Sequence, residues 1–152
     1  MLGIGNRMRG DDAVGSVVAE QLVKEGRVAA LDCGEMPDNY VGKLWELNPE
    51  ELVFVDACNF GGAPGEIRVF DEADLARIDS SPLSTHHVPL PMLIGLIRMK
   101  KGVARRVLLV GVQPRQIAYF QEQMSAEVQQ AVPKAVALVR ELAEADRGET
   151  RS

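Results

Sequence analysis

The chain has 152 residues, of which 46% are hydrophobic and 26% are charged, and its formal net charge at pH 7 is −5. This composition is typical of one globular domain with its own hydrophobic core, and the acidic balance argues against nucleic acid as a partner because no basic stripe is present to neutralise phosphates. No apolar run approaches the roughly 20 residues that span a bilayer and no signal peptide precedes the first predicted strand, so we expect a cytoplasmic protein without membrane insertion.

Short apolar runs alternate with helix-period patterns in the first part of the chain. The elements predicted there are a strand end at Leu2 and Ile4, a helix over about 12–24, a buried strand over 28–32, a short helix over 41–47 and a strand over 52–55. The last of these, LVFV, is the clearest strand, because a continuous apolar run is typical of a parallel strand covered on both faces. Gly26 is expected to close the first helix.

The same alternation continues to the end of the chain. The elements predicted there are a half-exposed strand over 66–70, a short acid-capped helix over 71–78, a helix beginning at Pro89 or Pro91, a buried strand over 107–112 and a long helix begun by Ser125. Together the elements predict an α/β fold, a three-layer sandwich in which a twisted, mostly parallel sheet of about five strands has helices on both faces. We expect one domain over residues 1–145 with an antiparallel edge strand at 66–70, and a disordered tail over 146–152.

Acidic residues follow the first three predicted strands. Asp12 lies just past the first strand, Asp32 ends the second and Asp56 ends the third, while the only histidines, His86 and His87, are adjacent in a loop before a helix. In an open α/β sheet, ligands collect beyond the carboxyl ends of the strands, so two carboxylates and an imidazole could converge there. Such a set suits a divalent transition metal with open coordination positions, and nickel, iron, zinc and cobalt all fit it.

A structural interpretation of the same residues stays open at this stage. Asp12 could cap a helix, Asp56 could accept bonds from backbone amides in a turn, and the histidines could be solvated. For Asp11 we favour helix capping. Cys33 and Cys58 are interpreted as small buried apolar residues rather than ligands, and two cysteines are too few for a disulfide framework.

Organic cofactor and nucleophile motifs are incomplete. Gly3 and Gly5 are not followed by the third glycine of a dinucleotide fingerprint, because Met8 stands at that position. Asp32 does imitate the acid that binds ribose, so a nucleotide-binding α/β protein remains an alternative. The chain has no GKS or GKT loop and no Gly-x-Ser-x-Gly elbow, and we expect no organic cofactor.

Five ordered stretches carry a resemblance to a known family. They are GIGNRMRGDDAVG, LDCG, FVDACNFGGAPGEIRVF, STHHVPL and LLVGVQP, and they run from Gly3 nearly to the final helix. In this order and spacing the chain resembles the nickel–iron hydrogenase maturation proteases, most closely the group that processes the large subunit of hydrogenase 3-type enzymes. The resemblance implies an α/β fold with a twisted sheet between helices.

The resemblance also implies an activity and a set of site residues. Members of the family are endopeptidases that remove a C-terminal extension from the hydrogenase large-subunit precursor after nickel insertion, and they are thought to recognise the nickel that the substrate carries. The family's metal-contacting residues fall on Asp12, Asp56 and His86. His86 is preferred to His87 because Thr85-His86-x-x-Pro89-Leu90 keeps the family's spacing.

The resemblance leaves the mechanism and one alternative function open. Water could attack the peptide bond with help from the nickel or from a carboxylate, as in an aspartyl protease. A non-proteolytic nickel-sensing or precursor-binding module would use the same residues.

The chain departs from the family pattern at two places. Met1 stands almost inside the first strand, so either that strand is short or the start lies upstream. Ala13 replaces a glycine that is common after the acid pair.

Overall fold

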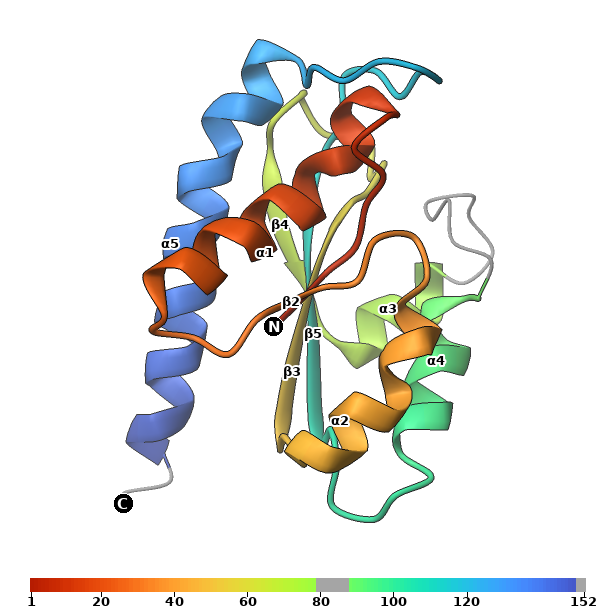
Figure 1. Ribbon diagram of the computed structural model, residues 1–152, viewed down its shortest axis with the longest axis vertical. Coiled ribbons are helices and arrows are strands. Elements are labelled where there is room, and N and C mark those ends of the chain that lie inside the picture. The colour runs from red at the N-terminus through yellow and green to blue at the C-terminus, as the bar shows by residue number, and fades with distance from the viewer. Residues whose placement is uncertain (79–87, 150–152) are drawn as a thin grey trace.

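A five-stranded sheet with helices on both faces forms the centre of the molecule (Figure 1). The computed structural model describes residues 1–78 and 88–149. The strands are β1 (Leu2–Gly3), β2 (Leu31–Asp32), β3 (Glu51–Ala57), β4 (Ile67–Phe70) and β5 (Arg106–Val112). Their order is β2-β1-β3-β5-β4, and all pairs are parallel except β4 with β5.

Helices cover the sheet in two layers. They are η1 (Gly10–Ala13), α1 (Val14–Glu25), η2 (Pro37–Tyr40), α2 (Val41–Leu47), α3 (Glu72–Ile78), α4 (Leu90–Ile97) and α5 (Ala126–Glu149), of which η1 and η2 are 3-10 helices. Figure 1 shows α1 and α5 on one side of the sheet and α2, α3 and α4 on the other. The predicted three-layer α/β sandwich with an antiparallel edge strand is therefore confirmed.

The strand β3 shows how the sheet separates two cores. Alternate residues of a strand point to opposite faces, and Phe54 packs into the core on the α2–α4 side while Val53 and Val55 pack into the core on the α1–α5 side. Phe54 is fully buried, and removing so large a side chain from a core costs about 3–5 kcal/mol. Seven residues of β3 pair in parallel with β5, so these two strands form the rigid middle of the sheet.

Glycine allows α1 to approach the sheet closely. A Cβ atom on Gly15 would lie 2.1 Å from the carbonyl oxygen of Ile4 and 2.2 Å from that of Val55. One on Gly3 would lie 2.0 Å from the carbonyl oxygen of Gly15. The first turn of α1 therefore lies directly on β1 and β3, which brings η1 to the carboxyl ends of these strands.

Two expectations about element limits are wrong. The strand predicted over 28–32 is the two-residue strand β2, and its Leu31 is only partly buried, because β2 stands at the edge of the sheet formed by the described strands. Residues 146–149, expected to be disordered, form the last turn of α5, supported by the helix formers Ala143, Glu144 and Ala145. None of the described helices is long and apolar enough to cross a bilayer.

Candidate active site at the carboxyl edge of the sheet

The connections of the sheet reverse direction between β1 and β3. From β1 the chain passes through α1 to β2 on one side, and β3 lies on the other side of β1. Beyond the strand ends the pairing continues, since the amide of Ile4 donates to the carbonyl oxygen of Val55 at 2.9 Å and that of Gly5 to Gly34 at 2.9 Å. Such a switch point is where open α/β sheets form their ligand crevice.

Asp56 stands at this switch point on β3. It is the sixth residue of the strand, pairs with Gly111 of β5, and is only 6% exposed. The alternation of β3 places it on the same face as Phe54, the face covered by α2, α3 and α4. The strand continues one residue past Asp56, so this acid belongs to the sheet rather than to a turn.

Asp12 reaches the same edge from η1 and is 1% exposed. Its carbonyl oxygen accepts a hydrogen bond from the amide of Asn6 at 3.2 Å, and a Cβ atom on Gly5 would lie 2.2 Å from that oxygen. Gly5 therefore lets the loop after β1 pass directly beneath Asp12. The N-cap residues are Arg9 for η1 and Ala13 for α1, so Asp12 does not occupy the N-cap position of either helix.

Asp11, the neighbouring acid, has a different role from the capping that we expected. Its buried carboxylate accepts hydrogen bonds from the amides of Arg115 at 2.8 Å, Gln116 at 3.0 Å and Ser125 at 2.6 Å, and from the Ser125 hydroxyl at 2.9 Å. All four donors belong to the segment that joins β5 to α5. Asp11 thus fastens that segment to η1, and the expectation that it caps its own helix is wrong.

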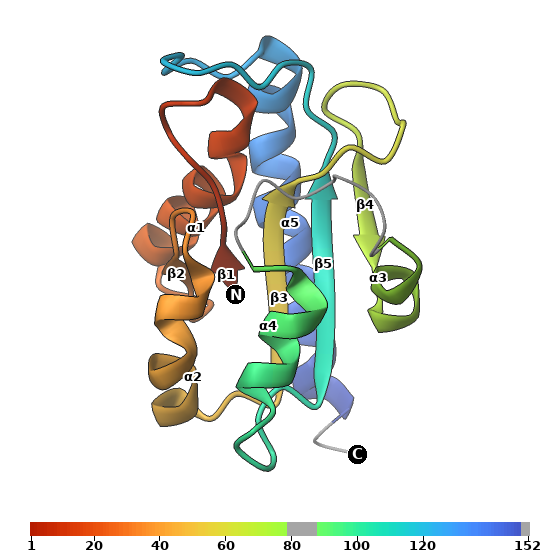
Figure 2. The same ribbon diagram turned by 90° about the vertical axis from the view of Figure 1, so that its right-hand side faces the viewer.

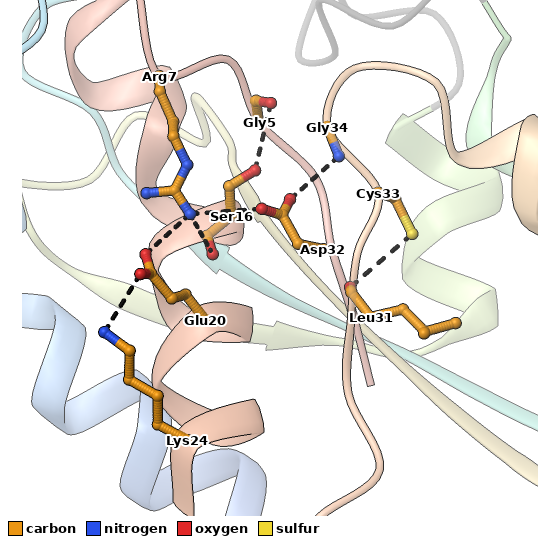
Figure 3. A network of polar contacts seen from close by, with 9 residues as sticks. All are labelled: Gly5, Arg7, Ser16, Glu20, Lys24, Leu31, Asp32, Cys33 and Gly34. Atoms are coloured by element: carbon orange, nitrogen blue, oxygen red, sulfur yellow. Dashed lines mark hydrogen bonds and ion pairs between the residues drawn. The ribbon is translucent and has the colours of Figure 1, made fainter.

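Asp32, at the end of β2, holds two loops together (Figure 3). One carboxylate oxygen accepts a bond from the Arg7 guanidinium at 3.3 Å and the other from the Gly34 amide at 3.1 Å. Arg7 also pairs with Glu20 at 3.0 Å, and hydrogen bonds from Lys24 and Arg7 lower the pKa of Glu20. These contacts account for Asp32 without a ribose, so nothing favours the nucleotide alternative.

His86 and His87 lie outside the described residues. The chain is described again from Val88, and Val88 and Leu90 pack against the core on the α2–α4 side, the face to which Asp56 belongs. In Figure 2, α4 runs opposite to β3 and β5, so its first turn points towards the carboxyl edge. Among residues 1–78 and 88–149, no three histidine, cysteine or acidic side chains are placed to hold a metal ion.

Both cysteines are buried thiols, as expected. Burial raises the pKa of Cys33 to about 12 and that of Cys58 to about 11, with smaller contributions from Asp32 and Asp56 respectively. A thiol must lose its proton to act as a nucleophile. At neutral pH these two groups are protonated, and neither is a candidate nucleophile.

Sequence reasoning missed Gln113, which shapes the neighbouring loop. Its side-chain oxygen accepts bonds from the amides of Phe60 at 2.9 Å and Gly62 at 3.2 Å, while its side-chain nitrogen donates to Asn59 at 3.1 Å. The signal available was a polar residue directly after a buried strand and before Pro114. Gln113 holds the glycine-rich loop after β3 in place beside Asp56.

Known proteins are similar to this chain in sequence and in architecture. A family model described as hydrogenase maturation protease matches residues 13–142. The hydrogenase 3 maturation protease of Escherichia coli (strain K12) is 35% identical over 122 residues, which cover 79% of this chain and 75% of that protein. This chain belongs to the hydrogenase maturation protease family.

Solved structures of relatives agree with this assignment. The [NiFe] hydrogenase maturation protease HycI from Thermococcus kodakarensis KOD1 superposes with a TM-score of 0.77 and 35% identity, over 94% of this chain and 90% of that one. The endopeptidase HycI from Escherichia coli superposes with a TM-score of 0.75 and 31% identity, over 90% of this chain and 85% of that one. The chain is a peptidase of this family, as the resemblance in the sequence predicts.

Proposed function

We propose that this peptidase removes the C-terminal extension of a nickel–iron hydrogenase large-subunit precursor, and that it recognises the nickel which the precursor carries. Asp12, Asp56 and His86 are the residues proposed to contact the nickel and the scissile bond. The nickel belongs to the substrate, whose own thiolates would complete its coordination, so few protein ligands are needed.

One observation of the structure supports the proposal most directly. Two carboxylates, Asp12 at 1% and Asp56 at 6% exposure, lie at the carboxyl ends of β1 and β3, on the two sides of the switch point. Buried acids are uncommon unless they are paired or functional. Asp11 and Asp32 bind neighbouring loops through their carboxylates, and we assign them a structural role.

These residues can carry peptide hydrolysis. A water oxygen bonds to the carbonyl carbon of the scissile peptide, the carbon–nitrogen bond breaks, and the proton that the water loses passes through a carboxylate to the leaving nitrogen. The carboxylate acts first as base and then as acid. The substrate's nickel can polarise the same carbonyl or lower the pKa of the water, and cleavage of a precursor loaded with a different divalent ion separates this route from a carboxylate route.

The deciding experiment replaces each acid by its amide. Asp12→Asn and Asp56→Asn are expected to abolish shortening of the nickel-loaded precursor on a gel, with melting temperatures close to that of the unaltered protein. Asp32→Asn, at the end of the neighbouring strand, is the matched control and should process normally. Normal processing by Asp56→Asn would contradict the proposed site.

The same assay distinguishes the two histidines and the non-proteolytic alternative. His86→Ala is expected to slow cleavage far more than His87→Ala, and the reverse order would move the assignment to His87. A module that binds the precursor without cutting it would retain the precursor on a column but release no shortened product.

A further inference from the structure

Exposed apolar side chains gather next to the candidate site. We call this set the edge patch; it consists of Met8, Met36, Tyr119 and Phe120. Tyr119 is 74% exposed and Phe120 is 89% exposed, the highest value among the exposed large hydrophobic residues of the described chain. The four residues come from three loops, those after β1, after β2 and after β5, and all three loops leave the carboxyl edge of the sheet.

Arg9 lies at the centre of the edge patch and connects its loops. The guanidinium carbon is 4.6 Å from the centre of the Tyr119 ring, and one guanidinium nitrogen is 3.8 Å from the carboxylate of Glu35, the residue before Met36. The backbones join as well, since the amide of Gln121 donates to the carbonyl oxygen of Met8 at 3.0 Å. These contacts hold the three loops that carry the edge patch against one another.

This surface is fixed to the candidate site. Figures 1 and 2 both show the segment between β5 and α5 lying over the loop after β1. Asp11 binds both ends of the 115–125 segment through its carboxylate, and Asp12 is the next residue. The Gly10 amide also donates to the carbonyl oxygen of Gln121 at 2.7 Å. The segment that carries Tyr119 and Phe120 is therefore bonded to the two residues that precede Asp12.

Phe120 combines a strained backbone angle with an exposed ring, and neither feature stabilises the fold. Its φ angle is 60°, in the left-handed region that residues with a side chain rarely adopt, and its ring is almost fully in solvent. An exposed aromatic ring on a strained backbone gives the folded chain no burial in return. Aromatic and methionine side chains of this kind are typical of the central contacts in protein interfaces.

We propose that the edge patch binds an apolar segment of the precursor polypeptide next to the scissile bond. This inference rests on the proposed function, because the precursor is the polypeptide that would lie across both Asp12 and the patch. Tyr119 and Phe120 act as anchors for apolar side chains of the precursor, and the Arg9 guanidinium, stacked on the Tyr119 ring, holds that ring in place. The patch contributes to binding and takes no part in the chemical step.

The test measures binding separately from cleavage. In an Asp56→Asn background, which is expected not to cut, the double variant Tyr119→Ser/Phe120→Ser is expected to bind the nickel-loaded precursor at least tenfold more weakly than Asp56→Asn alone. In the cutting background the same double variant should lower kcat/KM by a similar factor while kcat at saturating precursor is retained. Val23→Ser is the matched control, because Val23 is also an exposed apolar residue but lies on α1 near its end at Gly26.

A further variant excludes damage to the fold. Phe120→Gly removes the ring and relieves the positive φ angle, so it should weaken binding while the melting temperature stays equal or rises. The edge patch would be rejected if the double variant bound as tightly as its parent, or if Met92→Ser on the exposed face of α4 weakened binding instead. It would equally be rejected if sedimentation showed that the patch joins two copies of this chain.

The outcomes also separate this inference from the proposed function. If the unaltered protein cuts the precursor and the double variant binds normally, only the edge patch is wrong. If the unaltered protein neither binds nor cuts a nickel-loaded precursor, the proposed function fails and the edge patch fails with it.

Discussion

The two ends of the sheet are built in opposite ways. At the carboxyl edge, loops are joined by buried polar contacts, and Asp11 alone accepts four hydrogen bonds from the segment between β5 and α5. At the amino end there is an apolar groove of about 490 Å³ between β2, β3, α2 and α5. Its lining includes Leu2, Leu31, Leu44, Leu52 and Val139.

The groove lies beside the part of β3 that β1 does not cover. β1 pairs with β3 only at Phe54 and Val55, whereas β5 pairs with β3 from Glu51 onwards. The amino group of Met1 lies in this apolar surrounding, donates to the carbonyl oxygen of Ala29 at 2.8 Å, and has its pKa lowered to about 6 by burial. An apolar groove is thus present at one end of the sheet, whereas buried polar contacts join the loops at the other.

This difference indicates which end of the sheet must hold its side chains in fixed positions for processing. An apolar groove reduces stability but does not move side chains at the opposite end, because β3 and β5 connect the two ends as one rigid unit. Loss of the buried hydrogen bonds of Asp11 would displace a loop next to Asp12. Changes to buried polar contacts at the carboxyl edge should therefore affect processing, and changes at the amino end should affect stability alone.

The largest effect is expected from removal of the Asp11 carboxylate, which joins the loops at the carboxyl edge. Asp11→Ala leaves three backbone amides and the Ser125 hydroxyl without their acceptor, and each buried donor left unsatisfied costs about 1–3 kcal/mol. We expect urea unfolding to show a loss of about 3 kcal/mol in the free energy of unfolding and the gel assay to show little processing. Asp32→Ala, on an exposed acid with bonds to two loops, should change stability by less than about 1 kcal/mol. A stable, active Asp11→Ala variant would show that the 115–125 segment is held by other contacts.

A substitution that fills the apolar groove tests whether the amino end of the sheet affects stability alone. Ala143 of α5 lines the groove, and Ala143→Leu adds apolar volume there. Each buried methylene contributes about 0.8 kcal/mol, so a gain of about 1 kcal/mol is expected in urea unfolding, with processing of the precursor unchanged. Reduced processing by this variant would mean that the two ends of the sheet are coupled.

The smallest effect is expected at the contact between α3 and α4. Arg98 donates to both carboxylate oxygens of Glu72 and to the carbonyl oxygen of Ala104, and its hydrogen bonds lower the pKa of Glu72 from 4.5. A lowered pKa in the folded state stabilises the protein above pH 4.5, and this contribution is lost as the pH falls through the folded pKa. Because the pair is largely exposed, Glu72→Gln should cost less than about 1 kcal/mol at pH 7.

The pH series supplies the check for this pair. Thermal unfolding of Glu72→Gln and of the unaltered protein should differ near pH 7 and converge below the folded pKa of Glu72, where its carboxylate is protonated in both. A difference that stays constant with pH would mean that the substitution acts through packing.

Local patterns were sufficient for most of the fold. The strands β3 and β5, the edge strand β4 and the start of α4 follow from apolar runs and prolines that are close together in the sequence. The reciprocal bonds between Asp71 and Asp74 confirm the acid-capped start of α3, with both amide-to-carboxylate distances near 3.0 Å. The limits of β2 and α5 were missed, because burial of an edge strand and continuation of a helix depend on neighbours that are distant in the sequence.

The candidate site was predictable only in part. Positions at strand ends were enough to bring Asp12 and Asp56 to one edge, because parallel strands end on the same side of a sheet. The role of Asp11 was not readable, since its partners lie 104 to 114 residues further along the chain. Sequence spacing likewise gave no reason to place Tyr119 beside Arg9.

The bonds from Asp11 also have a consequence for folding. Asp11 and its donors in the 115–125 segment are 104 to 114 residues apart in the sequence. Contacts between residues so distant carry a large entropic cost of loop closure and tend to form late. We therefore expect the loop that borders Asp12 to be among the last parts of the fold to become ordered.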